Sequence, residues 1–68
     1  MSALVNAVER VERALRARIG DRAAEVLTKR SRYLAGLSPY EMIQAPHGDR
    51  VVLAELDNIV RQAGATVS

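Results

Sequence analysis

The sequence has no cysteine, no phenylalanine and no tryptophan, and its 68 residues include one histidine and two tyrosines. Without cysteine the chain can form no disulfide and cannot bind zinc through thiolates. The one histidine, His47, cannot form a metal site without carboxylate partners, and we expect no cofactor. Because aromatic side chains are scarce, the core has to be built from Leu, Ile, Val, Ala and Met, which suits packing between small helices.

Long apolar runs are also missing, and no signal peptide is recognisable. The longest stretch nearly free of charge, residues 33–44, is too short and too polar to cross a bilayer. Together with the lack of cysteine, this favours a cytoplasmic bacterial or phage protein that does not contact membranes. A chain of this length forms one domain, residues 1–68, which buries only about 60% of its unfolded surface. Association with a second copy or a partner would add stability.

The apolar residues that are present recur every three or four positions, which predicts an all-α fold, a small bundle of four helices. The helices are expected at about 2–19, 22–35, 39–44 and 50–63, with 65–68 as a short C-terminal tail. Gly20, Gly36 and Gly64 are expected to end helices. Asp21 and Asp49 are expected to cap the second and the fourth helix.

The third helix has the most complete set of local signals. Ser38 is followed by Pro39 and, three positions after the serine, by Glu41, which is the pattern of a capping box with proline at the first helical position. Ala45 precedes Pro46 and is therefore disfavoured in the helical region. We expect this helix to be short and to set the angle between its neighbours.

Signals for catalysis are poor. The sequence contains no HExxH, no GxSxG and no glycine-rich phosphate loop. His47 has Glu41 and Asp49 near it in the sequence, but a histidine between proline and glycine is typical of an exposed turn. Tyr40 is expected to be a core or interface residue. These patterns favour a protein that is not an enzyme and has no small-molecule substrate.

Positive charge is concentrated in residues 10–32, which carry a local charge of +5, whereas residues 33–68 carry −2. Opposite charges on the two parts indicate surfaces for different partners, or two copies packed head to tail. Lysine and arginine neutralise phosphates, so the alternative function is that of a small basic DNA-binding regulator of phage or mobile-element type. A solvated, ion-paired helix face is the other interpretation, since Arg13 and Arg16 each follow a glutamate by four residues. The candidate phosphate contacts are Arg10, Arg13, Arg16, Arg18, Lys29, Arg30 and Arg32.

An apolar stripe runs along the first helix, formed by Leu4, Val8, Val11 and Leu15. The stripe either packs inside the monomer or forms a self-association seam with another copy. It spans two heptads, which is fewer than an independent coiled coil needs. We take a homodimer through this stripe as the expected assembly.

The second half of the sequence also carries a family pattern, made up of Leu34, Gly36, Ser38-Pro39, Met42-Ile43, Gly48, Val51 or Val52, Leu56, Ile59 and Gly64. It resembles the C-terminal toxin-binding domain of Xre/MbcA/ParS-type antitoxins over about residues 33–64. The resemblance implies an all-α module without enzyme activity that binds and inhibits or regulates a partner protein, as family members do with a toxin acting on NAD. The implied partner-binding residues are Asp57, Arg61, Gln62, Gly64 and Ala65. Only about 32 residues precede the match, too few for the family's usual DNA-binding unit.

Overall fold

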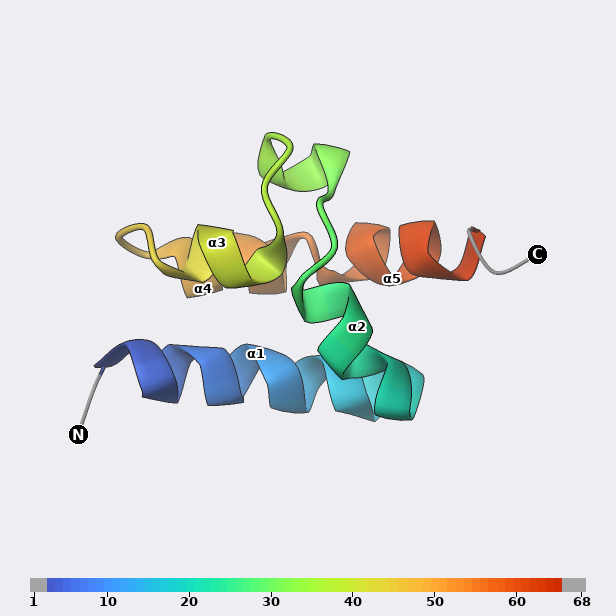
Figure 1. Cartoon of the computed structure of the whole chain (residues 1–68), viewed down its shortest axis with the longest axis horizontal. Coiled ribbons are helices and arrows are strands. Elements are labelled where there is room, and N and C mark those ends of the chain that lie inside the picture. The colour runs from blue at the N-terminus through green and yellow to red at the C-terminus, as the bar shows by residue number, and fades with distance from the viewer. Residues whose placement is uncertain (1–2, 66–68) are drawn as a thin grey trace.

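The computed structural model describes the backbone of residues 3–65 and the side chains of residues 3–64, and the predicted all-α class is confirmed. The elements are α1 (Ala3–Ile19), the 3-10 helix η1 (Gly20–Arg22), α2 (Ala23–Leu27), the 3-10 helix η2 (Arg32–Leu34), α3 (Pro39–Ile43), α4 (Gly48–Ala54) and α5 (Leu56–Ala65). Helix α1 lies along one side, and α3, α4 and α5 form a second layer opposite it (Figure 1). Helix α2 joins the two layers, and α1 contacts each of the other four α-helices directly.

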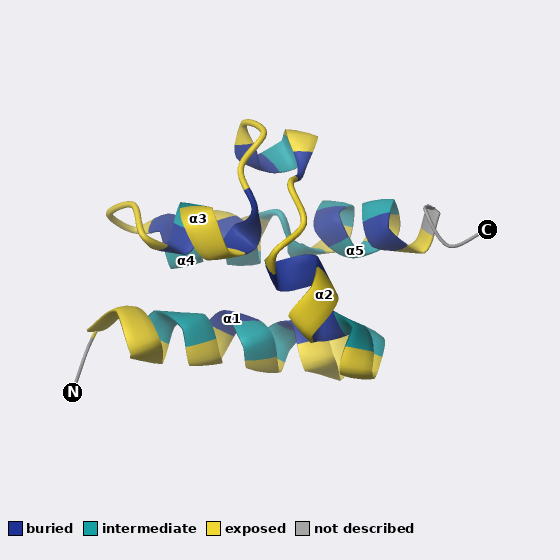
Figure 2. Cartoon of the chain, viewed as in Figure 1, coloured by how far each residue is buried: buried dark blue, intermediate teal, exposed yellow. Residues whose placement is uncertain are grey.

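The core lies between these two layers, and the buried positions of α1 and α2 face the second layer (Figure 2). Its buried apolar residues are Val11, Leu15, Ala23, Val26, Leu27, Leu34, Ile43, Val52, Ile59 and Ala63. Each of the five α-helices, and η2 through Leu34, therefore supplies part of a single apolar cluster. None of the described helices is both long enough and apolar enough to span a membrane.

This packing corrects the predicted self-association stripe of α1. Val11 and Leu15 are 0% exposed inside the chain's own core, so they are not available to a second copy in this conformation. Val8 is half-buried and packs against the same cluster. Leu4, which is 37% exposed, is the member of the stripe that lies at the surface. The stripe packs within the monomer because the second layer covers its C-terminal half.

The second helix is shorter than predicted, because α2 ends at Leu27 instead of near residue 35. Beyond it Ser31 is only 4% exposed, and its backbone N–H donates to the Leu37 carbonyl oxygen at 3.1 Å. The Ser31 hydroxyl accepts the N–H of Tyr33 at 3.2 Å and so caps η2. These bonds close a loop that projects from the second layer (Figure 1).

Two residues at the tip of this loop adopt left-handed backbone conformations, Ala35 with φ of 57° and Gly36 with φ of 82°. Gly36 therefore allows the loop to turn back toward α3, and it does not end a long second helix as predicted. A left-handed alanine is uncommon, since its Cβ approaches the following carbonyl oxygen.

The capping box of the third helix is confirmed. The Ser38 hydroxyl accepts the Glu41 N–H at 3.1 Å, and the Glu41 carboxylate accepts the Ser38 N–H at 3.0 Å. Pro39 occupies the first turn and is buried, so it also fixes the start of the helix against the core. Two orphan backbone donors at the start of a five-residue helix are thereby satisfied.

The predicted fourth helix is found as two helices, α4 and α5, separated at Glu55. The Glu55 N–H is shared between the carbonyl oxygens of Val51 and Val52, which tightens the last turn of α4 and turns the chain into α5. Helix α5 runs to Ala65, so Gly64 lies within it and does not end it.

The two predicted aspartate caps are wrong. Asp21 lies inside η1, whose N-cap position is Ile19, and neither η1 nor α2 has a side-chain cap. Helix α4 begins at Gly48, one residue before Asp49, and its N-cap position His47 makes no side-chain cap bond. Asp49 instead forms an ion pair with Arg10 of α1 at 3.5 Å, which ties the start of α4 to the opposite layer.

Candidate protein-interaction site

A small cleft lies between the segment at the end of α2 and helix α5, and its volume is about 60 Å³. We call it the α2–α5 cleft; it is lined by Val26, Lys29, Arg30, Ser31, Ile59, Gln62 and Ala63. Pockets that bind small molecules usually measure about 300–1,000 Å³. The α2–α5 cleft is therefore sized for the end of one side chain and not for a cofactor or a substrate.

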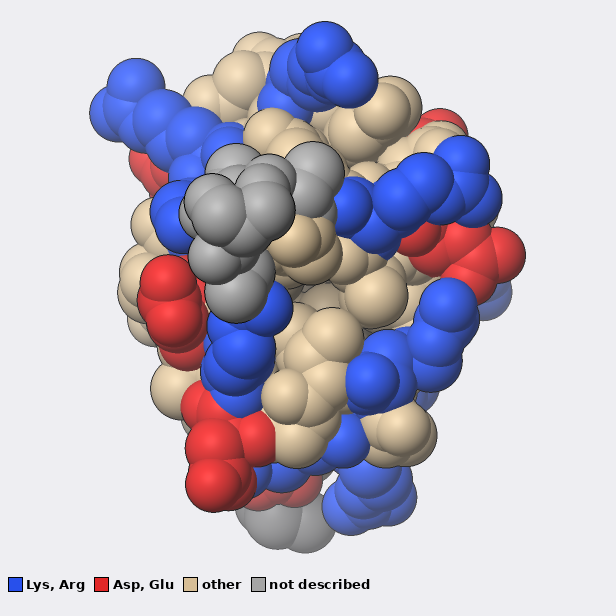
Figure 3. Space-filling view, turned by 90° about the vertical axis from the view of Figure 1, so that its right-hand side faces the viewer, with Lys and Arg blue, Asp and Glu red and all other residues tan. Residues whose placement is uncertain are grey.

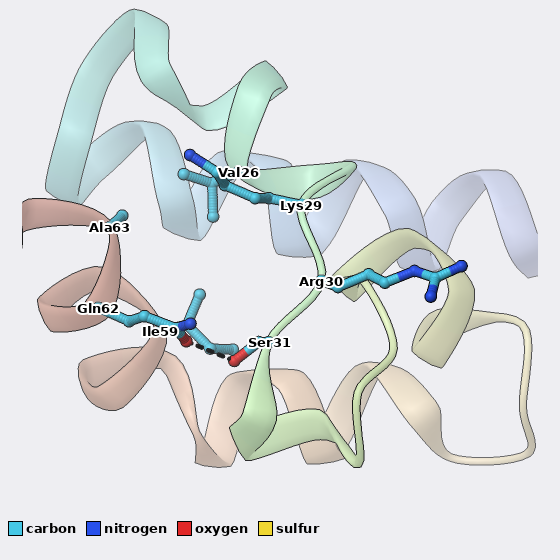
Figure 4. A pocket seen from close by; sticks show the side chains of 7 residues that line it. All are labelled: Val26, Lys29, Arg30, Ser31, Ile59, Gln62 and Ala63. Atoms are coloured by element: carbon cyan, nitrogen blue, oxygen red, sulfur yellow. Dashed lines mark hydrogen bonds between the residues drawn. The ribbon is translucent and has the colours of Figure 1, made fainter. Parts of the chain in front are cut away.

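The floor of the cleft is apolar. Val26 and Ile59 are each 3% exposed and point into the space between α2 and α5 from opposite sides (Figure 4). Ala63, one turn beyond Ile59 on α5, completes the floor with a side chain too short to fill it. The cleft is the point where the core reaches the surface between the two helices.

On one side of the cleft, two lining residues that are far apart in the sequence form a hydrogen bond. The Ser31 hydroxyl donates to Oε1 of Gln62 at 2.8 Å, as the dashed line in Figure 4 shows. Because Ser31 is buried, this bond is shielded from water and fixes the loop beyond α2 against α5. The bond gives the cleft a defined shape before any partner arrives.

The charged residues that line the cleft are basic. Lys29 reaches back along α2, where its ammonium lies 3.6 Å from the Glu25 carboxylate and its side chain stays 50% exposed. Arg30 points away from the cleft, toward the other side of the loop (Figure 4). Arg22 donates to the carbonyl oxygen of Ala63 at 3.2 Å, which places a cation at the C-terminal end of α5.

Basic side chains outnumber acidic ones at the end of the molecule formed by η1, α2 and α5, with acidic side chains beside them toward the edges and uncharged surface between (Figure 3). None of the seven residues that line the cleft is acidic. The arrangement combines an apolar floor with a positive rim, a combination that suits a partner carrying apolar and negative groups.

The predicted partner-binding residues lie in different environments. Gln62 lines the cleft, while Arg61 and Gly64 on the same helix are exposed. The Asp57 carboxylate is 2.6 Å from an Arg18 guanidinium nitrogen, so it links α5 to α1 although its side chain is 71% exposed. The side chain of Ala65 lies outside the described residues.

The predicted phosphate contacts are mostly engaged in ion pairs. Arg10, Arg18 and Lys29 pair with Asp49, Asp57 and Glu25 respectively. Arg16 pairs with Glu12 at 3.5 Å and with Asp21 at 3.7 Å.

The remaining three predicted phosphate contacts lie on different elements. The Arg32 guanidinium stacks over the Tyr33 ring at 5.2 Å, while Arg13 lies on α1 and Arg30 beyond α2. The structure brings Lys29 and Arg30 to the same cleft as Gln62, and distributes the others along α1 and the projecting loop.

Of the residues considered for catalysis, His47 and Asp49 line one open hollow of about 470 Å³ beside the start of α1, whereas Glu41 and Tyr40 do not line it. His47 is exposed at the start of α4 with φ of 59°. Tyr40 is 44% exposed on α3, so it is not a core residue. Within residues 3–65, no three histidine, aspartate or glutamate side chains come together in a way that could hold a metal ion.

The apolar half of the site could not be recognised from the sequence. Val26 and Ile59 follow the ordinary spacing of core residues, and nothing local marks them as the floor of a cleft. Ser31 and Gln62 are 31 positions apart, so their bond follows only from the packing of α2 against α5. The one available signal was the predicted exposed face of the last helix, which includes Gln62.

Comparison with known proteins yields no relative: no protein-family model, no curated protein and no solved structure matches the chain. The function therefore has to be argued from the α2–α5 cleft and the surface around it.

Proposed function

We propose that the protein is a helical interaction module without enzyme activity, which binds and regulates a partner protein through α5 and the α2–α5 cleft. The observation that carries the proposal is an apolar cleft, open at the surface and sized for one side chain, with Lys29 among its lining residues. Arg61 is exposed on the outward face of the same helix, α5. Protein interfaces concentrate binding energy where an anchor side chain enters such a desolvated pocket. Arginine is enriched at these sites, and its planar guanidinium forms two parallel hydrogen bonds with a carboxylate.

The resemblance to toxin-binding domains extends this proposal to an antitoxin-like role in a bacterial or phage-infected cytoplasm. In that role the last turn of α5, with Arg61 and Gly64, would approach the partner first. The Ser31–Gln62 bond supports this use of α5, because it holds the helix in place and reduces the entropy lost on binding.

A second candidate function is that of a small nucleic-acid-binding regulator, and the basic end of the molecule in Figure 3 favours it. Against it, Arg10, Arg16, Arg18 and Lys29 are already paired with carboxylates. A phosphate backbone contacting all four side chains would have to displace an acid from each of them, whereas a protein partner at the cleft would have to displace only Glu25 from Lys29. We therefore place protein binding first.

Site-specific photo-crosslinking in the native host tests the proposal. Arg61 is replaced by p-benzoylphenylalanine, and a second version carries the same residue at Arg50, which is exposed on α4 away from the cleft. We expect irradiation to give a discrete protein adduct from position 61 and little or none from position 50. Adducts of equal yield from both positions, or none from either, would contradict protein binding through α5.

The nucleic-acid alternative has its own signature. Binding to a short DNA duplex would weaken steeply with salt, because each neutralised phosphate releases a counterion. A gel-shift or anisotropy titration at two salt concentrations measures this slope directly. We expect weak binding at low salt that disappears at physiological salt; a duplex retained at physiological salt would move the second function to first place.

A further inference from the structure

We infer that the α2–α5 cleft takes an acidic amphipathic segment of a partner protein, with one apolar side chain in the cleft and carboxylates on the basic rim. The inference rests on the proposed function and names the chemistry of the partner. It follows from the floor, the charges around it and the end of α5, taken in turn below.

The apolar part of the segment follows from the floor. Val26 and Ile59 face each other across the cleft, and Ala63 leaves the space between them unfilled (Figure 4). The space measures about 60 Å³, well below the usual size of a ligand pocket, and its floor is apolar. The branched end of one valine or leucine side chain is the kind of group that suits it.

The acidic part follows from charge complementarity. Lys29 is the cation at the cleft, because Arg30 lines it but directs its guanidinium away (Figure 4). The end of the molecule around the cleft is rich in basic side chains (Figure 3). Glu25 of α2 pairs with Lys29 at 3.6 Å, and both side chains are half exposed or more. Such a pair is weak and readily exchanged, so a partner carboxylate can replace Glu25 at the ammonium. Asp57 on α5 is occupied by Arg18 at 2.6 Å.

The C-terminal end of α5 would ordinarily repel an acidic partner, because the last carbonyl groups of a helix carry partial negative charge. Arg22 compensates for this by donating to the carbonyl oxygen of Ala63 at 3.2 Å. The cation therefore offsets the negative end of the helix at one side of the cleft. A carboxylate can approach there without meeting an uncompensated dipole.

Three fluorescein-labelled peptides test the inference with the full-length chain. The first is a helical peptide of about 15 residues, long enough for partial helicity, in which leucines recur every three or four positions among glutamates. The second replaces the glutamates by lysines, and the third replaces the leucines by serines. Fluorescence anisotropy measures binding of each peptide to the wild type, to Lys29→Glu and to Arg50→Glu.

Lys29→Glu and Arg50→Glu change the net charge equally, but only Lys29 lies at the cleft. We expect the leucine–glutamate peptide to bind the wild type, and both altered peptides to bind at least about tenfold more weakly. Lys29→Glu is expected to weaken the first peptide about tenfold, because attraction at the rim becomes repulsion, and Arg50→Glu by less than about twofold.

Three results overturn the inference: no saturable binding of the leucine–glutamate peptide, equal binding of the glutamate and lysine peptides, or equal loss from Lys29→Glu and Arg50→Glu. A DNA duplex that binds more tightly than this peptide and is lost with Lys29→Glu also overturns it, in favour of nucleic acid. The crosslinking at position 61 reports separately on the proposed function. If position 61 gives a protein adduct but the glutamate and lysine peptides bind equally well, the proposed protein-binding function is retained and the inference of an acidic partner is rejected.

Discussion

At the residue scale, Glu41 shows how one side chain holds a short helix. Its carboxylate accepts the backbone N–H of Ser38, and that hydrogen bond is the largest of the influences that lower the pKa of Glu41 below its ordinary value of 4.5. A hydrogen bond with the Ser38 side chain acts in the same direction and is the second largest influence, ahead of an opposing effect of desolvation; the charge of Arg30 adds the smallest lowering influence. The influences that lower the pKa do so because they stabilise the ionised carboxylate of Glu41.

The lowered pKa makes the capping box sensitive to acid. A carboxylate whose pKa is lower in the folded state stabilises the fold above the unfolded pKa, and this contribution is lost as the pH falls through the folded pKa. We expect the melting temperature of the wild type to fall as the pH drops below 4.5, through the lower pKa of folded Glu41. The measurement is thermal unfolding by circular dichroism as a function of pH.

Glu41→Gln is the matched control, since glutamine keeps the capping-box hydrogen bond but does not titrate. The difference in melting temperature between wild type and Glu41→Gln should shrink or reverse as the pH falls. If the two curves run parallel across this range, Glu41 does not contribute to the acid sensitivity.

At the element scale, the contact between α3 and α4 depends on Gly48. A Cβ atom added there would lie 1.6 Å from the Met42 carbonyl oxygen, so the two helices could not keep their present separation. The backbone of Gly48 is buried at this crossing, and its N–H donates to the Ala45 carbonyl oxygen at 2.9 Å. The turn between α3 and α4 therefore requires glycine at position 48, where no side chain fits.

Gly48→Ala is expected to destabilise the fold by about 2–3 kcal/mol, because overpacking forces backbone shifts. Gly64→Ala is the matched control: an added Cβ meets nothing within 4 Å there, and alanine favours a helix over glycine by up to about 1 kcal/mol. Urea unfolding of both variants measures the difference. If Gly48→Ala is as stable as Gly64→Ala, then α3 and α4 do not pack as described.

The boundaries of α3 and α2 show which features of an element the sequence can predict. The start of α3 is correct because Ser38, Pro39 and Glu41 act on each other within one turn. Helix α2 is too long in the prediction because its end is determined by Ser31, which bonds with Leu37 and with Gln62. Helical spacing cannot reveal contacts of this kind, since they form only after the second layer is in place.

The candidate site follows the same rule. The sequence alone places Arg61 and Gln62 outside the apolar stripe of the last helix, and in the structure Arg61 is exposed and Gln62 half-buried at the cleft. The cleft was not accessible, because Val26 and Ile59 have the spacing of ordinary core residues. Exposed Tyr40 could not be told from a core aromatic, since burial depends on which helix covers α3.

At the scale of the whole molecule, basic residues from the first half of the sequence form ion pairs with acidic residues from the second half. Arg10 of α1 pairs with Asp49 of α4, and Arg18 of α1 pairs with Asp57 of α5. The basic first half of the sequence thus faces part of the acidic second half across the core. Each exposed pair contributes at most about 1 kcal/mol, but together they favour one arrangement of the layers.

These ion pairs and the burial of Val11 and Leu15 bear on the assembly state. The sequence alone favours a homodimer, because a 68-residue chain is marginal and its stripe on α1 could meet a second copy. In the structure that stripe is largely covered, and the opposite charges already meet inside one chain. We therefore expect a folded monomer of 7.4 kDa.

Light scattering after size exclusion measures the mass across a wide range of protein concentration, and thermal unfolding at the same concentrations tests whether folding and association are linked. A monomer gives a constant mass and a constant melting temperature, whereas a dimer gives twice the mass and a melting temperature that rises with concentration. If the dimer is found, the exposed apolar surface must carry it, and Val5, which is 52% exposed, is the side chain to change. Val5→Lys would then restore the monomer without loss of the core, since Val5 lies outside the buried cluster.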